Sequence, residues 1–175
     1  MHNLSLYDAL YDAAPQIQHV VVRHEQAAGF AADGYARATG RPGVAITTAG
    51  PGATNALTAV AEAWSDSSPV VLIASHIESP YVELERGFGH ELRGQLEVFQ
   101  TATRFRKRPM HVREIGPSIA EAFAQAQRGR PRPVMVQVPH REPTRSPQRR
   151  RRRTAASRWH AGGPVRWMLQ TLLDG

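Results

Sequence analysis

The stretch VVVRHEQAAGFAADGYARATGRPGVAITTAGPGATN, residues 20–55, decides the fold of this chain. It runs from a β-branched apolar segment through an alanine-rich segment to a second apolar segment, and it ends in a glycine-rich turn. This order predicts a strand at 18–23, a helix at 25–39 closed by Gly40, and a second strand at 44–49. Glu25 follows the first predicted strand after one intervening residue, His24, and is the candidate catalytic residue of the stretch.

The remaining elements follow from the same periodicities. Continuous apolar runs are typical of strands in a parallel sheet that is covered on both faces. The alternation of strands and helices predicts an α/β fold, doubly wound, with a largely parallel sheet and helices on both faces. We expect strands at 69–75, 101–106 and 134–139, helices at 4–11 (capped by Asn3), 53–64 and 117–127, a helical turn at 96–99, and a long surface loop at 76–94.

The net charge of +7 is local. Residues 141–158 hold eight arginines and one glutamate, so the rest of the chain has fourteen basic and fourteen acidic residues. We therefore expect one domain at 1–140, a disordered arginine-rich segment at 141–160, and a short segment with a helical pattern at 161–175. The five consecutive arginines at 149–153 could bind nucleic acid by charge, although a solvated tail without a role is the favoured interpretation.

The composition excludes several classes of protein. The chain has no cysteine, so it forms no disulfide and no thiolate metal site, and no histidine spacing suggests a metal ligand set. No run approaches the length of a membrane span, and the N-terminus does not resemble a signal peptide. The expected location is the cytoplasm.

The candidate site lies where two predicted strands end. A carboxylate at a strand's carboxyl end, beside a glycine turn at the end of the next strand, is where parallel α/β sheets usually place ligands. Two simpler interpretations stay open at this point. Glu25 would also complement a helix dipole as the first residue of a helix, and Gly50-Pro51-Gly52 alone would be only a tight turn.

Two longer motifs favour the ligand site. HEQAAGFAADGYARATGRPGV, followed by TTAGPGATNALTAVAEAWSDSSPVVLI, resembles the pyrimidine-binding domain of thiamine-diphosphate enzymes such as acetolactate synthase and benzoylformate decarboxylase. The resemblance covers about residues 6–138 and implies a doubly wound α/β domain. In that pattern an extra strand precedes the segment that matches residues 6–10, so we expect a sheet that lacks its first strand.

The resemblance also implies roles for individual residues. Glu25 matches the glutamate that hydrogen-bonds N1′ of the aminopyrimidine and exchanges a proton there. Gly50, Pro51 and Gly52 match the loop that closes on the ring, and Asn55 either supports this loop or touches the ring, with loop support favoured. His90 matches a position that faces the substrate, against the alternative of an exposed loop histidine.

The implied cofactor is thiamine diphosphate, but part of its site is not recognisable in the sequence. The family binds the diphosphate and Mg²⁺ through a second domain with a GDG motif, which does not occur here. We therefore expect a partner, either a diphosphate-binding subunit or a homo-oligomer, and a small 2-keto acid as substrate. The chain is expected to be a truncated, inactive form of an acetolactate-synthase-like enzyme, or alternatively a subunit of a split 2-keto-acid decarboxylase. Acetolactate synthesis, decarboxylation and oxalyl-CoA-type cleavage all remain open.

Overall fold

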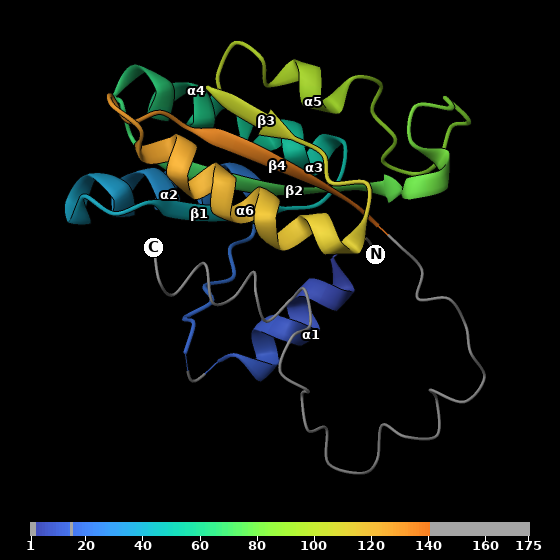
Figure 1. Ribbon diagram of the computed structural model, residues 1–175, viewed down its shortest axis with the longest axis horizontal. Coiled ribbons are helices and arrows are strands. Elements are labelled where there is room, and N and C mark those ends of the chain that lie inside the picture. Colours follow the sequence, from blue (N-terminus) through green and yellow to red (C-terminus); the bar gives the residue numbers. More distant parts are fainter. Residues whose placement is uncertain (1–2, 15, 141–175) are drawn as a thin grey trace.

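The computed structural model describes residues 3–14 and 16–140, which form a layered α/β structure (Figure 1). Within these residues, four parallel strands make a sheet in the order β1-β2-β4-β3. The strands are β1 Gly43–Thr47, β2 Val70–Glu78, β3 Phe105–Lys107 and β4 Val134–His140. The predicted strands at 44–49, 69–75 and 134–139 are confirmed, and the one predicted at 101–106 is shorter and begins at Phe105.

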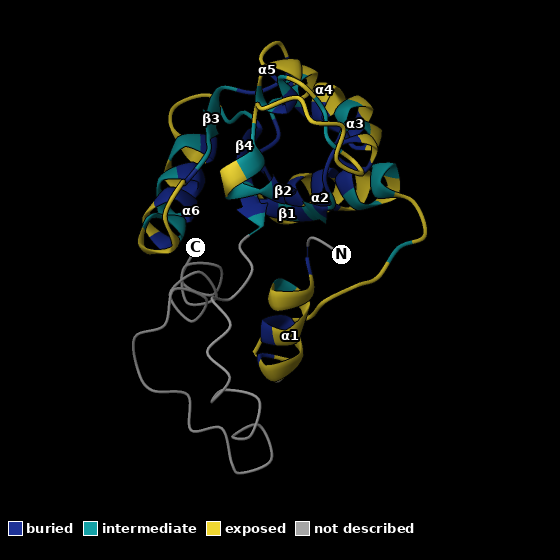
Figure 2. Cartoon of the chain, turned by 90° about the vertical axis from the view of Figure 1, so that its right-hand side faces the viewer, coloured by how far each residue is buried: buried dark blue, intermediate teal, exposed yellow. Residues whose placement is uncertain are grey.

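Helices cover both faces of this sheet, as the predicted fold class requires (Figures 1 and 2). On one face, Leu72 and Met135 pack in a cluster with Val60 and Phe99. On the other, the neighbouring strand residues pack against the long helix between β3 and β4. The first face carries α2 Glu25–Thr39, α3 Pro51–Asn55, α4 Leu57–Ser65 and α5 Gln95–Val98, the second carries α6 Val112–Gln127, and the outlying elements are α1 Leu4–Asp12 and the 3₁₀ turn η1 Ser79–Tyr81.

Helix α2 has the bounds that the sequence predicts. It ends at Gly40, whose φ of 69° is the left-handed conformation that closes many helices. Its small residues allow a close approach to α4, because a Cβ on Gly29 would lie only 2.6 Å from the Cβ of Ala59. Arg37 adds a polar link, since its guanidinium contacts Asp66 at 2.5 Å just after α4.

The strand predicted at 18–23 is wrong. This segment is an extended coil that joins α1 to α2 and takes no part in the sheet. His19 stacks on Tyr7 of α1 with ring centroids 5.6 Å apart, and Val20 and Val21 are 68% and 81% exposed. A strand needs a neighbour for its N–H and C=O groups, and this segment runs from α1 to the start of α2 without pairing with β1 (Figure 2). Glu25 therefore opens a helix but does not end a strand.

Two helix predictions and one loop prediction also need correction. The single helix expected at 53–64 is divided into α3 and α4 at Ala56. The helix expected at 117–127 starts five residues earlier, because His111 and Glu114 form a capping box and Pro117 lies inside the helix. The loop expected at 76–94 begins later, since β2 continues to Glu78 and η1 follows. The short helix at 96–99 is confirmed as α5.

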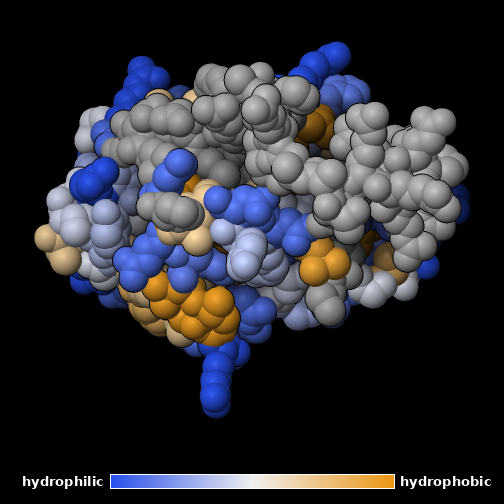
Figure 3. Space-filling model, turned by 90° about the horizontal axis from the view of Figure 1, so that it is seen from below, coloured by the Kyte–Doolittle hydropathy of each residue, from blue (hydrophilic) through white to orange (hydrophobic). Residues whose placement is uncertain are grey.

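Helix α1 lies apart from the layers on the face seen from below, where apolar surface is visible (Figure 3). Asn3 precedes it as predicted, but its side-chain amide donates to the carbonyl of Thr47 at 3.0 Å and does not cap the helix. Tyr7 and Tyr11 of α1 are 42% and 83% exposed. The arginine-rich segment at 141–160 and the segment at 161–175 lie outside the described residues. Among the described helices, none has the length and apolar character to cross a membrane.

Candidate functional site

Glu25 is the first residue of α2 and is half-buried. The residue before it, His24, is the N-cap, and its Nδ1 accepts a hydrogen bond from the backbone N–H of Gln26 at 3.2 Å. This contact stabilises the start of the helix and gives His24 a structural task. A carboxylate in the first helical turn also benefits from the helix dipole. The local sequence thus holds Glu25 in a defined place.

The carboxylate of Glu25 meets the glycine-rich turn directly. Asn55, the last residue of α3, donates from Nδ2 to Oε2 of Glu25 at 3.0 Å. The other oxygen faces Gly52, where an added Cβ would lie 3.0 Å from Oε1. Two segments thirty residues apart in the chain therefore converge on one carboxylate. Asn55 acts here on Glu25 itself, a contact that neither sequence-based interpretation of Asn55 included.

Gly50 opens the turn in a conformation that favours glycine. Its φ is 56° and its ψ is −117°, and an added Cβ would overlap the backbone carbonyl of His90. Pro51 follows as the first residue of α3, a position that suits proline because the N–H there has no partner within the helix. The turn thus requires glycine for both its conformation and its packing.

His90 lies beside this turn, as the sequence places it. The contact is made by its backbone carbonyl, and the residue itself has a φ of 65° and is exposed. The loop that carries His90 is held by a ring contact of 4.6 Å between Tyr81 and Phe88 and by an ion pair of 2.5 Å between Arg108 and Glu83. The hydrogen bond from Arg108 to Glu83, followed by the positive charge of Arg108, lowers the pKa of the Glu83 carboxyl. A substrate contact through the His90 side chain stays a prediction.

Gln95 belongs to the site, although no pattern in the sequence indicates this. Its side chain is fully buried, and Oε1 accepts from the N–H of Gly50 at 2.7 Å. Its Nε2 donates to the carbonyl of Ser75 in β2 at 3.0 Å. One amide therefore fastens the glycine turn to the central sheet. A polar residue in an aperiodic stretch, 45 residues from its partner, carries no local pattern that would reveal this role.

A family model described as "Thiamine pyrophosphate enzyme, N-terminal TPP binding domain" matches residues 1–102, which include Glu25, the glycine turn, Asn55, His90 and Gln95. The chain belongs to the thiamine pyrophosphate enzyme family. The resemblance seen in the sequence is thereby confirmed.

The relatives of this thiamine pyrophosphate enzyme domain are longer proteins. It is 42% identical over 139 residues to the acetolactate synthase isozyme 2 large subunit of Escherichia coli, covering 78% of this chain and 24% of that protein. It is 40% identical over 141 residues to a probable 2-ketoarginine decarboxylase of Pseudomonas aeruginosa, covering 79% and 24%. A probable acetolactate synthase large subunit of Methanocaldococcus jannaschii is 38% identical over 139 residues, covering 78% and 22%. The chain spans about a quarter of the length of these relatives.

The residues of the site fit one part of the family's cofactor. The carboxylate, the amide and the glycine that would be blocked by a Cβ suit a flat ring with a nitrogen at its edge. In the part of the chain that the structure describes, no group of three or more His, Asp or Glu side chains could hold a metal ion. Contacts between these residues and the aminopyrimidine ring stay a prediction.

Replacing Gln95 by Leu should destabilise the thiamine pyrophosphate domain. The change leaves the buried N–H of Gly50 and the buried carbonyl of Ser75 without partners, at a cost of about 1–3 kcal/mol each. We expect urea denaturation to show a loss of about 2–6 kcal/mol in the free energy of unfolding. Gln100→Leu, at an exposed position near by, should change it by less than about 0.5 kcal/mol. Equal effects of the two changes would show that Gln95 does not anchor the turn.

Proposed function

We propose that this chain supplies the half-site that binds the aminopyrimidine ring of thiamine diphosphate. The observation that supports this is the carboxylate of Glu25, held by Asn55 at 3.0 Å and facing Gly52. The ring would lie against the glycine backbone, and Glu25 would accept and return a proton at the ring nitrogen N1′. When bound, the cofactor supplies the carbon that attacks a 2-keto acid and the group that stores the resulting electron pair.

The whole enzyme is proposed to be acetolactate-synthase-like and to act on a small 2-keto acid. The support is the identity of about 40% to an acetolactate synthase and to a probable 2-ketoarginine decarboxylase. Since the chain spans 24% of these relatives, we assign the diphosphate and Mg²⁺ to a partner domain and expect no activity from the chain alone. That domain belongs either to a longer form of this protein or to a separate subunit of a split decarboxylase.

Calorimetric titration with thiamine diphosphate tests the half-site. The full chain would be titrated in Mg²⁺, alone and after mixing with the part of the Escherichia coli relative that this chain does not match. We expect binding that requires Mg²⁺ in the mixture and at least about tenfold weaker binding by the chain alone, because the ring contacts are only part of the binding free energy. The unmatched part of the relative, titrated by itself, is the control.

Two results would contradict this account. Equally tight, Mg²⁺-dependent binding by the chain alone would show that it carries a complete cofactor site. Binding by the mixture no tighter than by the added part alone would show that Glu25 and the glycine turn do not contribute. If the mixture binds no more tightly than the added part, thiamine, which has the aminopyrimidine ring but no diphosphate, should also fail to bind to the chain.

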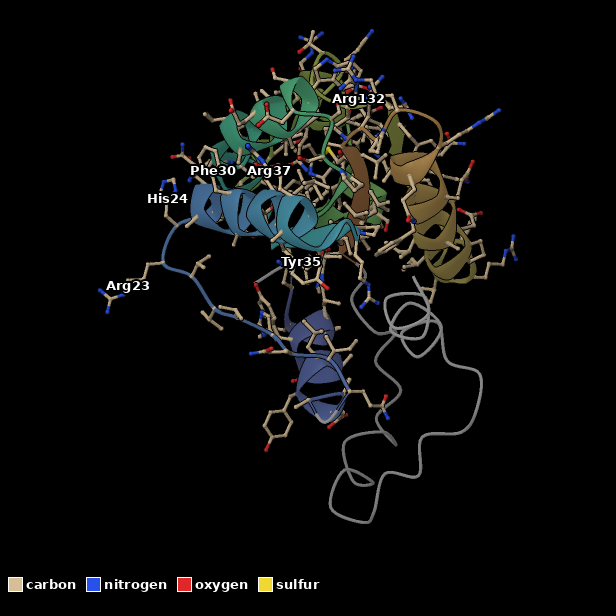
Figure 4. All side chains as sticks on the ribbon, turned by 90° about the vertical axis from the view of Figure 1, so that its left-hand side faces the viewer. Arg23, His24, Phe30, Tyr35, Arg37 and Arg132 are labelled. Carbon is tan, nitrogen blue, oxygen red and sulfur yellow. The ribbon has the colours of Figure 1, made fainter. Side chains whose placement is uncertain are left out.

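The exposed side of α2 is the surface we propose for contact with a second protomer. Ala27, Ala31 and Gly34 form a strip of exposed small residues along the helix. Phe30 and Tyr35, 41% and 47% exposed, stand on either side of it, and Figure 4 shows them on opposite sides of the α2 ribbon. Small residues flanked by aromatic ones permit two helices to approach closely and still bury a large apolar area.

Introducing a charge on this strip should reduce self-association. Ala31→Glu places a carboxylate in the centre of the proposed contact, where burial without a partner is costly. Ala61→Glu makes the same change at an exposed position on α4 and serves as the matched control. We expect analytical ultracentrifugation to show at least about tenfold weaker dimerisation for Ala31→Glu only. Equal dimerisation of both variants would place the contact elsewhere.

A further inference from the structure

Three arginines gather at the edge of the sheet where the strands begin, far from Glu25. Arg104 directly precedes β3, and its guanidinium donates to the backbone carbonyls of Arg128 and Arg130, the latter at 2.6 Å. These contacts fix the connection between α6 and β4. The side chains of Arg130 and Arg132, which project from this connection, are thereby held in place. We call Arg104, Arg130 and Arg132 the arginine cluster.

Two members of the arginine cluster converge on one hydroxyl group. Nε of Arg130 and Nη1 of Arg132 are each 2.6 Å from Oγ of Ser67, so these nitrogens are at most twice that distance apart. Arg132 also donates to the carbonyl of Trp64 at 2.6 Å, and its guanidinium carbon lies 4.7 Å from the centroid of the Trp64 ring. Both guanidinium groups are therefore oriented by contacts to the turn between α4 and β2.

The positive charges of the cluster are not balanced by near carboxylates. Among the described residues, no Asp or Glu forms an ion pair with Arg104, Arg130 or Arg132. Asp66 is next to Ser67 in the chain, but its carboxylate contacts Arg37 at 2.5 Å. Desolvation, followed by the charges of Arg130 and Arg104, lowers the pKa of Arg132. The cluster is thus a local excess of positive charge in a body with equal numbers of acidic and basic residues.

Holding the turn between α4 and β2 in place does not require two guanidinium groups. A single N–H from each side chain makes the contact to Ser67. Both terminal nitrogens of Arg130, and Nε and Nη2 of Arg132, donate to no described residue. An uncharged or smaller donor would make the same contact to Ser67 without the repulsion between two guanidinium groups. The remaining N–H groups, fixed and close together, are suited to an anion.

We propose that the arginine cluster binds a phosphate group, with Arg130 and Arg132 donating to its oxygens and Arg104 positioning them. The planar fork of a guanidinium matches two phosphate oxygens, and a phosphate has enough oxygens and charge to satisfy two such forks at once. The site lies at the amino ends of the strands, whereas Glu25 and the glycine turn lie at their carboxyl ends. Figure 4 shows Arg132 well away from His24 at the start of α2.

Calorimetric titration of the full chain with inorganic phosphate at constant ionic strength tests the site. We expect saturable binding, weakened at least about tenfold in Arg130→Gln and in Arg132→Gln, because each loses charge-assisted hydrogen bonds. Arg113→Gln, an exposed change on α6, should bind as the unchanged chain does. Adenosine monophosphate, titrated in parallel, distinguishes a site for free phosphate from one for the phosphate of a larger molecule: tighter binding of the nucleotide favours the latter.

The other arginines of the chain provide the decisive control. A variant with Gln at all five positions 149–153 should retain the binding, since the proposed site does not include them. The proposal is overturned if this variant loses the binding while Arg130→Gln keeps it, or if Arg130→Gln and Arg132→Gln bind phosphate as the unchanged chain does. Arg130→Lys keeps the charge and should recover part of the affinity, which separates loss of binding from a misfolded loop. Thermal unfolding of every variant confirms that the compared proteins are folded.

Discussion

Glu25→Gln is expected to slow the exchange of the C2 proton of bound thiamine diphosphate by at least about 100-fold, in the chain assembled with its diphosphate-binding partner. Glutamine has nearly the same shape, and its amide oxygen still accepts from Nδ2 of Asn55, which now donates to Oε2 at 3.0 Å. What is lost is the ability to accept a proton at the ring nitrogen and to return it. Exchange measured by proton NMR after rapid quenching reports this loss directly.

Two further variants make the Glu25 result specific. Glu62→Gln removes an exposed carboxylate from α4 and should leave the exchange rate unchanged. Asn55→Ala removes the donor to Glu25 and should slow exchange by a smaller factor, about tenfold, because the carboxylate keeps its chemistry but loses its orientation. An unchanged exchange rate in Glu25→Gln, with cofactor bound, would remove this residue from the mechanism.

The wrong prediction at 18–23 shows that a local apolar pattern is not sufficient to determine a strand. The run at 18–23 contains three consecutive valines, yet it is coil. A strand forms only if another strand offers its N–H and C=O groups, and this requirement is absent from the six residues themselves. Helix α2 satisfies its hydrogen bonds internally, so its sequence from Glu25 to Gly40 was sufficient to place both ends.

In the candidate site too, residues within a local motif were predicted, whereas residues brought together only by the fold were missed. The position of Glu25 beside the glycine turn was predicted, because a motif of known geometry contains both, but the hydrogen bond from Asn55 to Glu25 was not. Gln95 was missed, because its importance arises from two backbone partners far away in the sequence. The arginine cluster was missed for a related reason. Its members and Ser67 come from three connections between elements, and only the folded sheet brings these connections to one edge.

Gly50→Ala is expected to have the second large effect, a loss of about 2–6 kcal/mol in the free energy of unfolding. An alanine would be strained at φ 56° and ψ −117°, which costs about 1–3 kcal/mol. Its Cβ would also overlap the carbonyl of His90, and overpacking of this kind costs about 1–3 kcal/mol more. Small domains are stable by about 5–15 kcal/mol, so urea denaturation should show a large shift or an unfolded chain.

Two other glycines separate the contributions to this loss. Gly40 also has a positive φ, 69°, but no atom would contact an added Cβ, so Gly40→Ala should cost only about 1 kcal/mol. Gly34 has open space and an ordinary helical position, so Gly34→Ala should stabilise the protein by about 0.5–1 kcal/mol. If Gly50→Ala cost no more than Gly40→Ala, the contact with His90 would not constrain the turn. The loop that carries His90 would then be free to move away from Gly50.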